Sequence, residues 1–507
     1  MKTIKQILIT TAVILCSATA NAYDFEIDGI RYDITSFSEL TVKASSLSET
    51  IVGELTIPSE VEFSGKVLKV IEICDDFASS NLSISSLTVD DGVISIGARA
   101  FKNCANLKTI DIAQSVTLLG EECFYGCSTL EAFSNKGIVT IGGKSFAECE
   151  NLKVVSIESL DSLQQGTFLN CSQLLDCNLP NIKSIGKEAF KNCQSLKEYY
   201  IPDVVTTIGE SAFENLPITN ITIPNNVLTI DNFAFKGCAS LLSIIIPNNV
   251  RQLGDNVFNG CISLTSISIG SGLLYLPWIF KGCTSLSEIR IEDSSTILTF
   301  GYTGEEEQKL PIVGSFSKYY SAPAMFKGFN LKKLYIGRNI TTEEYCYNSY
   351  YEYEYGNYYD YCEYYVPNPP FSESNINSLI IGPLVSTLEM CGYNNGNNTG
   401  AFQNCTNLDS VIIHSTATYI PENTFYGCNK IKSLEIPNTI REIGSNAFYG
   451  CAGLKNLSLG SNLGTIGINA FYGCDSLMEI NIKNPNPPTY NTEFSNIHYI
   501  NTNTSVQ

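Results

Sequence analysis

The sequence predicts an α/β solenoid, in which short repeats stack on one another and their strands pair in parallel. Phenylalanine recurs every 22 or 23 residues, and cysteine follows most of these phenylalanines after three residues. Between the pairs, apolar and polar residues alternate as they do along a β-strand. A fixed period of this length is typical of stacked repeats. The repeat phenylalanines are Phe101, Phe124, Phe146, Phe168, Phe190, Phe213, Phe235, Phe258, Phe280, Phe402, Phe425, Phe448 and Phe471.

Each repeat contains a predicted turn and then a strand. Phe101, Cys104 and Leu107 stand three residues apart, and this spacing predicts one helical or 3₁₀ turn with a single buried face. Period-two alternation then predicts a strand, as at Ile110 and Ile112, Ile221 and Ile223, and Leu434 and Ile436.

The rest of the repeat brings the chain round to the next coil. Pro247 ends a strand, where a missing N–H does least harm. Val250 and Leu253 form a second apolar pair, and glycines such as Gly186 and Gly444 are expected in a tight turn after it. The sequence predicts about 15 coils when degenerate ones keyed on Phe77, Phe326 and Phe371 are included.

The N-terminus predicts export. Lys2 and Lys5 precede an apolar run, and Ala20-Asn21-Ala22 has the form of a signal-peptide cleavage site. The mature chain would then begin at Tyr23. Cys16 offers the alternative of a lipid anchor, although the residue before it is not the small one that such sites favour.

The charge of the chain limits its partners. The formal net charge is −20, and loss of Lys2 and Lys5 with the signal peptide makes it −22. This balance disfavours nucleic acid and anionic membrane surfaces as partners. Beyond the signal region, no apolar stretch is long enough to predict insertion into a membrane.

The sequence of the repeats resembles that of a known family. The pattern Leu-x-x-Ile-x-Ile-Pro-x-x-Val-x-x-Ile-Gly-x-x-Ala-Phe-x-x-Cys is similar to the BspA-type leucine-rich repeat of bacterial surface proteins, and residues 241–261 match it with Val257 in place of alanine. Residues 23–34 resemble the N-terminal caps of Bacteroidetes members. The resemblance implies a right-handed leucine-rich-repeat solenoid, secreted or on the outer cell surface, often serving adhesion. It supplies no shared catalytic residues.

The chain is accordingly divided into six predicted parts. Residues 1–22 are the signal peptide and 23–70 an N-terminal β cap. Leucine-rich repeats occupy 71–292, repeats with long loop insertions occupy 293–401, and regular repeats return at 402–484. A degenerate tail covers 485–507.

The chain contains 19 cysteines, and most of them are predicted to pack rather than to cross-link. Twelve follow a repeat phenylalanine, where parallel Cα–Cβ vectors keep stacked Cβ atoms about 4.8 Å apart, too far for a disulfide. A column of buried thiols is therefore expected, and no metal site. Cys346 and Cys362 lie outside the column, and there a disulfide and a pair of free thiols both remain open.

The period breaks in three consecutive repeats. The second strand isoleucine normally precedes the next phenylalanine by 12 residues, as Ile112 precedes Phe124. The spacing is 35 from Ile291 to Phe326 and 35 from Ile336 to Phe371, and 21 from Ile381 to Phe402. Insertions in one arc of a repeat emerge on one side of the stack, so one composite patch is expected. The alternative is that each long excess is a decayed coil.

The middle insertion is rich in tyrosine, with eleven tyrosines in the 21 residues 345–365. Tyrosine offers a flat contact and a hydroxyl at low entropic cost, as in adaptable binding loops. The predicted ligand-binding residues are Tyr345, Tyr347, Tyr350, Tyr351, Tyr353, Tyr355, Tyr358, Tyr359, Tyr361, Tyr364 and Tyr365, with Tyr302, Tyr319, Tyr320 and Tyr393 nearby. The alternative is a low-complexity insertion without a ligand.

Two functional interpretations follow. The first is a binding or adhesion protein that contacts a host protein, a bacterial surface protein or a glycan through the tyrosines. The second is a structural or assembly protein without a specific ligand. No enzyme, cofactor or catalytic residue is predicted, because the two histidines, His414 and His498, accompany no recognisable nucleophile motif.

Overall fold

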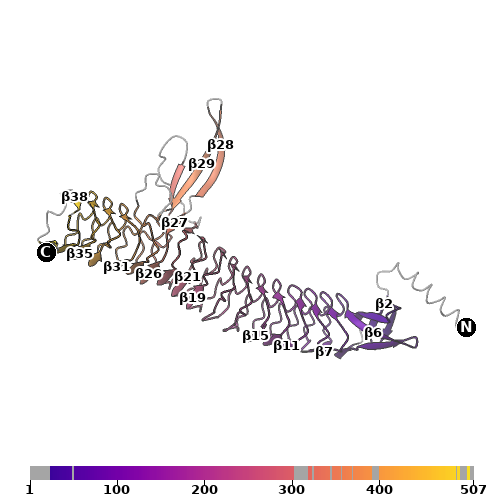
Figure 1. The fold of residues 1–507 in the computed structure, drawn as a ribbon. Coiled ribbons are helices and arrows are strands. Elements are labelled where there is room, and N and C mark those ends of the chain that lie inside the picture. The colour runs from indigo at the N-terminus through magenta and orange to yellow at the C-terminus, as the bar shows by residue number, and fades with distance from the viewer. Residues whose placement is uncertain are drawn as a thin grey trace. The chain divides into compact units, whose positions relative to one another are not determined.

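The computed structural model describes residues 23–47, 51–301, 318–322, 325–342, 345–354, 357–367, 369–390, 399–486, 488–490 and 499–502. The chain divides into two compact units, residues 1–239 and 240–507, and Figure 1 labels several strands of each. The described residues contain strands and turns but no helix. The predicted α/β class is therefore wrong in its α part, because the turns at the repeat phenylalanines are not helical.

The first unit begins with antiparallel strands. β1 (Phe25–Ile27) pairs with β2 (Ile30–Ser36), and β2 pairs with β3 (Thr41–Leu47). Asp28 and Gly29 between β1 and β2 have φ of 50° and 78°, the two positive values that a two-residue hairpin turn requires and that Asp-Gly favours. β5 (Glu60–Phe63) is antiparallel to β6 (Lys66–Ile73), and β3 is parallel to β6.

The repeats of the first unit each contribute up to two strands. The first strands of the repeats are β4 (Gly53–Ile57), β7 (Ile84–Val89), β9 (Thr109–Ile112), β11 (Ala132–Asn135), β13 (Val154–Ile157) and β15 (Asp176–Asn178). The shorter second strands are β8 (Ser95–Ile96), β10 (Leu118–Leu119), β12 (Thr140–Ile141), β14 (Ser162–Leu163), β16 (Ser184–Ile185), β17 (Thr207–Ile208) and β18 (Thr229–Ile230). Successive strands pair in parallel, as Leu118 of β10 does with Thr140 of β12.

The second unit repeats this plan. Its first strands are β19 (Ser243–Ile246), β21 (Ser266–Ile269), β23 (Glu288–Ile291), β26 (Lys333–Ile336), β30 (Ser378–Ile381), β31 (Ser410–Ile413), β33 (Ser433–Glu435), β35 (Asn456–Leu459), β37 (Glu479–Ile482) and β39 (Tyr499–Thr502). Its second strands are β20 (Gln252–Leu253), β22 (Tyr275–Leu276), β24 (Leu298–Phe300), β27 (Ile340–Thr342), β32 (Tyr419–Ile420), β34 (Glu442–Ile443), β36 (Thr465–Ile466) and β38 (Thr489–Tyr490). Three further strands, β25 (Lys318–Ala322), β28 (Tyr345–Glu354) and β29 (Asn357–Pro367), lie in the insertions.

The repeat phenylalanines form a column of stacked rings in the core of each unit. Phe146 lies between Phe124 and Phe168, with ring centroids 5.5 and 5.8 Å away, and it has no exposed surface. In the second unit, Phe326 and Phe371 stack at 4.9 Å. The two phenylalanines at the long repeats therefore occupy ordinary repeat positions, as the sequence predicts.

The turn around each repeat phenylalanine is not helical, because residues with a left-handed backbone conformation alternate along it with residues of right-handed conformation. Glu122 and Gly126 flank Phe124 with φ of 54° and 70°, in the left-handed region that a right-handed helix excludes. The N–H groups of Glu122, Phe124 and Gly126 donate to carbonyl oxygens of the next repeat, each at 2.8 Å. Hydrogen bonds that a helix would use within itself therefore join neighbouring repeats instead.

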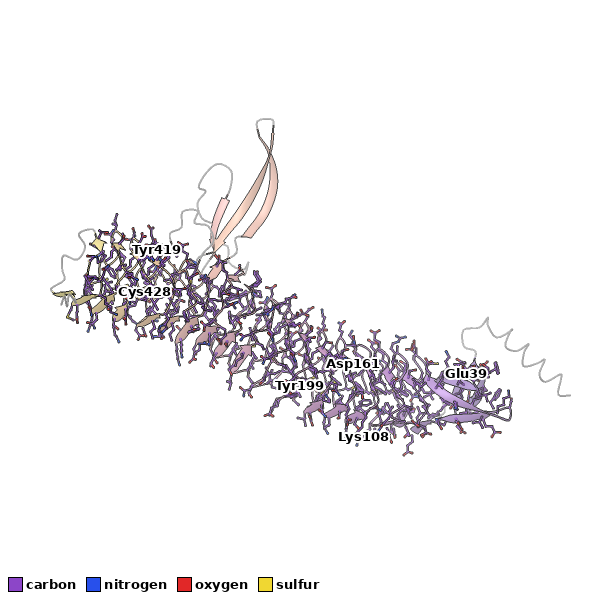
Figure 2. All side chains as sticks on the ribbon, viewed as in Figure 1. Glu39, Lys108, Asp161, Tyr199, Tyr419 and Cys428 are labelled. Atoms are coloured by element: carbon purple, nitrogen blue, oxygen red, sulfur yellow. The ribbon has the colours of Figure 1, made fainter. Side chains whose placement is uncertain are left out.

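The cysteine column consists of buried free thiols, as the sequence predicts. Most thiols donate a hydrogen bond to the backbone oxygen of the preceding repeat's phenylalanine, as Cys127 does to Phe101 and Cys428 to Phe402. Burial raises the pKa of Cys104 to about 11 and that of Cys283 to about 12. Cys428 is labelled in Figure 2. The cysteines thus satisfy a carbonyl as well as filling space.

We expect the column thiols of the native protein to resist alkylation at pH 8. Only a thiolate attacks iodoacetamide, and burial both raises the thiol pKa and blocks access. Mass spectrometry should show the column unlabelled in buffer and fully labelled in urea, with the half-buried Cys474 reacting first. Rapid labelling of Cys127 or Cys149 in buffer would contradict this packing.

The strand predicted at Ile221 and Ile223 is not formed. Both side chains are buried, at 9% and 5% exposure, but the segment lacks strand pairing. Ile221 follows Phe213 by eight residues, whereas Tyr199 follows Phe190 by nine. This repeat therefore reaches its strand position one residue early.

Tyr199 lies at the buried position that a strand residue occupies in neighbouring repeats, although its own segment forms no strand, and its hydroxyl is not used by the core. Its ring lies 4.8 Å from that of Phe190, and its buried hydroxyl has no hydrogen-bond partner among the described residues (Figure 2). Burial raises its pKa well above the ordinary value.

We expect Tyr199→Phe to stabilise the first unit by about 1 kcal/mol, because it removes an unsatisfied buried polar atom without changing the ring. Urea unfolding followed by circular dichroism measures the change. The exposed Tyr200 provides a matched control, since Tyr200→Phe should leave the midpoint unchanged. A midpoint lowered by Tyr199→Phe would show that the hydroxyl has a partner.

The glycines after the second apolar pair serve close packing rather than a left-handed turn. A Cβ at Gly186 would lie 2.5 Å from the backbone oxygen of Leu163, and one at Gly444 would lie 2.6 Å from the backbone nitrogen of Glu422. Neither glycine has a positive φ. In the described part of the chain, no helix is long and apolar enough to cross a membrane.

Candidate functional site: a tyrosine-rich sheet at the long repeats

The long spacings leave the pairing of the main sheet unchanged. Ile291 of β23 pairs directly with Ile336 of β26, which pairs with Ile381 of β30 and then with Ile413 of β31. No described residue of the extra chain adds a strand between these four. Most of the added residues of the first two long repeats follow the second strand, β24 or β27, and precede the phenylalanine, so they behave as insertions rather than decayed coils.

Two of the insertions meet in one small sheet. β28 and β29 form an antiparallel hairpin from the second insertion, and β25 from the first insertion pairs in parallel with β29. The order is therefore β25-β29-β28, and no described repeat strand joins this sheet. Figure 1 draws the hairpin with its labels. The expected composite patch thus has a backbone basis in the first two insertions.

The register aligns tyrosine with tyrosine. Tyr345 pairs with Tyr365, Tyr350 with Tyr361, and Tyr353 with Tyr358. The strand from the first insertion extends one of these rows, because Tyr320 pairs with Tyr365. Alternation along the strands places tyrosines at positions of both faces.

Most of the predicted site tyrosines are on these strands. Tyr345, Tyr347, Tyr350, Tyr351 and Tyr353 are in β28, and Tyr358, Tyr359, Tyr361, Tyr364 and Tyr365 are in β29, where the structure describes the backbone. Tyr319 and Tyr320 are in β25. Tyr302, Tyr355 and Tyr393 lie outside the described residues, so their predicted membership of the patch stays a prediction.

The two hairpin cysteines are not opposite one another. Cys346 pairs with Tyr364, and Cys362 pairs with Ser349. Cys362 therefore lies two positions along β29 from Tyr364, the residue opposite Cys346, which is about 7 Å along the strand. A disulfide between Cys346 and Cys362 would need this register to shift, since bridged Cα atoms are about 4.4–6.8 Å apart.

An arginine that the sequence analysis missed anchors the repeat from which the hairpin begins. Arg338 is fully buried just before β27, and its Nη1 donates to the backbone oxygens of Leu273 at 2.6 Å and Ser271 at 3.0 Å. Its Nη2 donates to the oxygen of Gly270 at 2.9 Å. Burial lowers its pKa to about 10. The guanidinium therefore extends past residues 292–297 of the intervening repeat and forms hydrogen bonds with the repeat of β21, two repeats earlier in the chain.

Arg338 fits because the segment that joins the two strands of the β23 repeat is longer than the same segment in a regular repeat. Residues 292–297 separate Ile291 of β23 from Leu298 of β24, whereas three residues separate Ile269 from Leu273. The extra residues leave carbonyl groups of the preceding repeat to be satisfied by the guanidinium. A lone arginine where other repeats carry neutral or acidic residues, such as Asn248, Ser461 and Asp203, was the available signal.

The sequence analysis also missed a cluster around Arg290 on the outer face of β23 and β26. Neighbouring side chains fix the position of the Arg290 guanidinium there. The Arg290 guanidinium carbon lies 3.9 Å from the ring centroid of Tyr335, and its Nε donates to Glu292 at 2.8 Å. The hydroxyl of Tyr335 donates to Asp293 at 2.7 Å. The hydrogen bond with Glu292 raises the pKa of Arg290. One tyrosine and two carboxylates thus hold one arginine.

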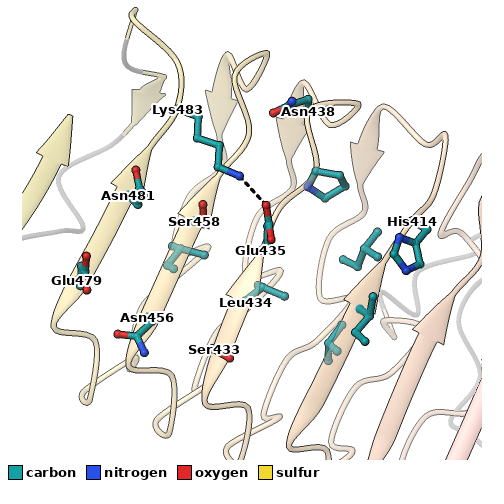
Figure 3. A pocket seen from close by; sticks show the side chains of 15 residues that line it. His414, Ser433, Leu434, Glu435, Asn438, Asn456, Ser458, Glu479, Asn481 and Lys483 are labelled. Carbon is teal, nitrogen blue, oxygen red and sulfur yellow. Dashed lines mark hydrogen bonds and ion pairs between the residues drawn. The ribbon is translucent and has the colours of Figure 1, made fainter. Parts of the chain in front are cut away.

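A groove of about 720 Å³ lies over β31, β33, β35 and β37 (Figure 3). Polar side chains line it, including His414, Asn456 and Glu479. Across it, Lys483 donates to Glu435, and Asn481 Oδ1 is buried without a partner among the described residues. Its polar side chains resemble ordinary solvated strand positions in the sequence, which is why the pattern did not reveal it.

The described residues include no group of three or more His, Cys, Asp or Glu side chains that could hold a metal ion. His414 lines the groove, and His498 lies outside the described residues. The described side chains of the groove and of the Arg290 cluster offer hydrogen bonding, aromatic contact and charge.

Comparison with solved structures finds other leucine-rich repeat proteins. One from Bacteroides ovatus is 22% identical, with 90% of this chain and 94% of that chain covered and a TM-score of 0.44. A leucine rich cell surface protein from Faecalibacterium prausnitzii is 21% identical, with 92% and 96% covered and a TM-score of 0.31. A search of curated proteins found no match.

The repeats themselves match a family model. The BspA type leucine rich repeat region matches residues 72–197, 162–287 and 397–506, in six copies. These ranges cover more than half of the chain, and their parallel strands agree with a leucine-rich repeat fold. The chain belongs to the BspA-type leucine-rich repeat family.

Proposed function

We propose that this chain is an exported binding protein that meets its ligand through the tyrosine-rich sheet of β25, β28 and β29. The observation that carries the proposal is the pairing of two separate insertions in one sheet with tyrosines in register. A chain that only tolerated extra residues has no need to align them across three strands. Proteins built from such repeats generally bind other molecules without catalysis.

The rest of the chain would serve as the support for this sheet. We propose a right-handed solenoid of about 15 coils closed at its N-terminus by residues 23–70. Parallel pairing of successive repeats and the antiparallel start of the chain support this arrangement. The basic and apolar N-terminal residues support export to the outer cell surface or the medium.

We expect removal of the hairpin to abolish ligand binding and to leave the melting temperature within about 2 °C of the native value, because surface insertions contribute little to the core. The variant replaces residues 343–370 with a copy of residues 421–424, which join second strand to phenylalanine in a regular repeat. Binding is measured on arrays of glycans and surface proteins with the mature chain.

A second variant tests the rings rather than the strands. Its hairpin keeps its length, but every tyrosine from Tyr345 to Tyr365 becomes threonine, which retains β propensity. Loss of binding in both variants supports the proposal. Array ligands that bind both variants as well as the native chain would refute it. Concentration-dependent light scattering without any array ligand would favour the structural or assembly role instead.

A further inference from the structure

We propose that the tyrosine-rich sheet recognises guanidinium groups, so that its partner is an arginine-rich segment of another protein. The inference rests on the proposed function and names the chemistry of the partner. It combines a guanidinium site formed within the same unit with the placement of tyrosines and carboxylates in the inserted sheet.

The guanidinium site within the unit is the cluster around Arg290. Its charge lies over the ring of Tyr335, its Nε bonds Glu292, and Tyr335 is itself held by Asp293. Ser268 also donates to the Glu292 carboxylate, at 2.7 Å. The cluster shows that a tyrosine on one strand and a carboxylate just beyond the end of the neighbouring strand can hold a guanidinium in this protein.

The inserted sheet places the same residue types on neighbouring strands. Glu352 pairs with Tyr359, and Asp360 pairs with Tyr351. Positions directly opposite in an antiparallel pair lie on one face of the sheet. Each pair therefore sets an aromatic residue and a carboxylate residue side by side, and the two pairs, in consecutive rows, occupy positions on opposite faces of the sheet.

The sheet supplies almost no cation of its own for these groups. β28 and β29 contain Glu352, Glu354, Asp360 and Glu363 but no lysine or arginine. Lys318 of β25 pairs with Glu363, which leaves the other three acidic residues without a cationic residue at the paired position. Charge complementarity thus favours a cationic ligand, and the net charge of −20 would steer one towards the protein.

Arginine fits this chemistry better than lysine or a neutral sugar. A guanidinium is planar, so it can stack on a tyrosine ring while its edge hydrogen-bonds a carboxylate. A lysine ammonium makes these contacts one at a time. A neutral glycan could use the rings, but its binding would not depend on the carboxylate charges.

The test uses the full mature chain and three synthetic peptides of one length. Each peptide alternates glycine with arginine, lysine or the neutral isostere citrulline, and binding is measured by calorimetry at low and at physiological salt. We expect the arginine peptide to bind at least about threefold more tightly than the lysine peptide, and the citrulline peptide not to bind. Binding of the arginine peptide should weaken with salt.

Two charge variants distinguish the site from the general acidity of the chain. The site variant carries Glu352→Gln, Glu354→Gln, Asp360→Asn and Glu363→Gln. The control variant carries Glu62→Gln, Glu150→Gln, Glu198→Gln and Asp203→Asn. These are four exposed carboxylates that are far from the hairpin in the sequence. Both lose four negative charges. We expect the site variant to bind the arginine peptide at least about tenfold more weakly and the control variant to change by less than about threefold.

The outcomes separate this inference from the proposed function. Equal weakening in both variants, or equal binding of arginine and lysine peptides by the native chain, would overturn the guanidinium inference. Array ligands that need the hairpin but not its carboxylates would overturn it as well and leave the proposed function standing. Circular dichroism of the site variant, with an unchanged spectrum, shows that its loss of binding is not a loss of folding.

Discussion

Replacing Arg338 by alanine is expected to lower the free energy of unfolding of the second unit by about 3–5 kcal/mol. The side chain has no exposed surface and donates to the backbone oxygens of Gly270, Ser271 and Leu273. Its removal leaves these buried oxygens without their donor and opens a space where the guanidinium was. Relief from burying a charge offsets only part of this loss.

Urea unfolding followed by circular dichroism measures the global change, and hydrogen exchange of the segment around Leu273 measures the local one. Arg338→Lys should cost less than Arg338→Ala, because an ammonium still donates to some of the carbonyls. Arg441→Ala is the matched control, since Arg441 is exposed. If Arg338→Ala and Arg441→Ala unfold at the same urea concentration, the guanidinium does not stabilise this segment.

Replacing Phe146 by alanine is expected to destabilise the first unit by about 3–5 kcal/mol, the usual range for a fully buried aromatic ring. The ring contacts Phe124, Phe168 and Phe133, the last with centroids 4.7 Å apart. The cavity left by alanine lies between two rigid neighbours, so collapse around it is limited.

The stability change is measured by urea or thermal unfolding. Phe146→Leu should cost less, because leucine fills most of the space. Phe37→Ala is the control, since Phe37 is 59% exposed and lies outside the column. Equal effects of Phe146→Ala and Phe37→Ala would mean that the column adds nothing to the core.

The sequence predicted the structure correctly wherever one residue type occupies the same position in successive repeats. Phenylalanine, cysteine and alternating isoleucine predict the ring column, the buried thiols and the parallel strands, because each position has the same neighbours in every repeat. Spacing between phenylalanines also located the insertions, since the core positions on either side of them are unchanged. The pairing of β25 with β29 could not be predicted, because it joins segments whose sequences carry no shared period.

The errors have a common physical origin in contacts between repeats. The turn at Phe124 is not helical because its N–H groups donate to the next repeat, which no spacing within one repeat reveals. The glycine at Gly186 is required by a backbone oxygen one repeat away. The sequence did not reveal the role of Arg338, because the backbone oxygens that it bonds are more than 60 residues earlier in the chain.

The reach of Arg338 also bears on how the second unit opens. In a stack where each repeat touches only its neighbours, fraying can stop at any boundary. Arg338 ties the repeat of β26 to the repeat of β21, so the repeat of β23 between them cannot detach from either side alone without breaking that tie. The three would then open as one cooperative block, and this block includes β27, the strand from which the chain continues into the tyrosine-rich hairpin.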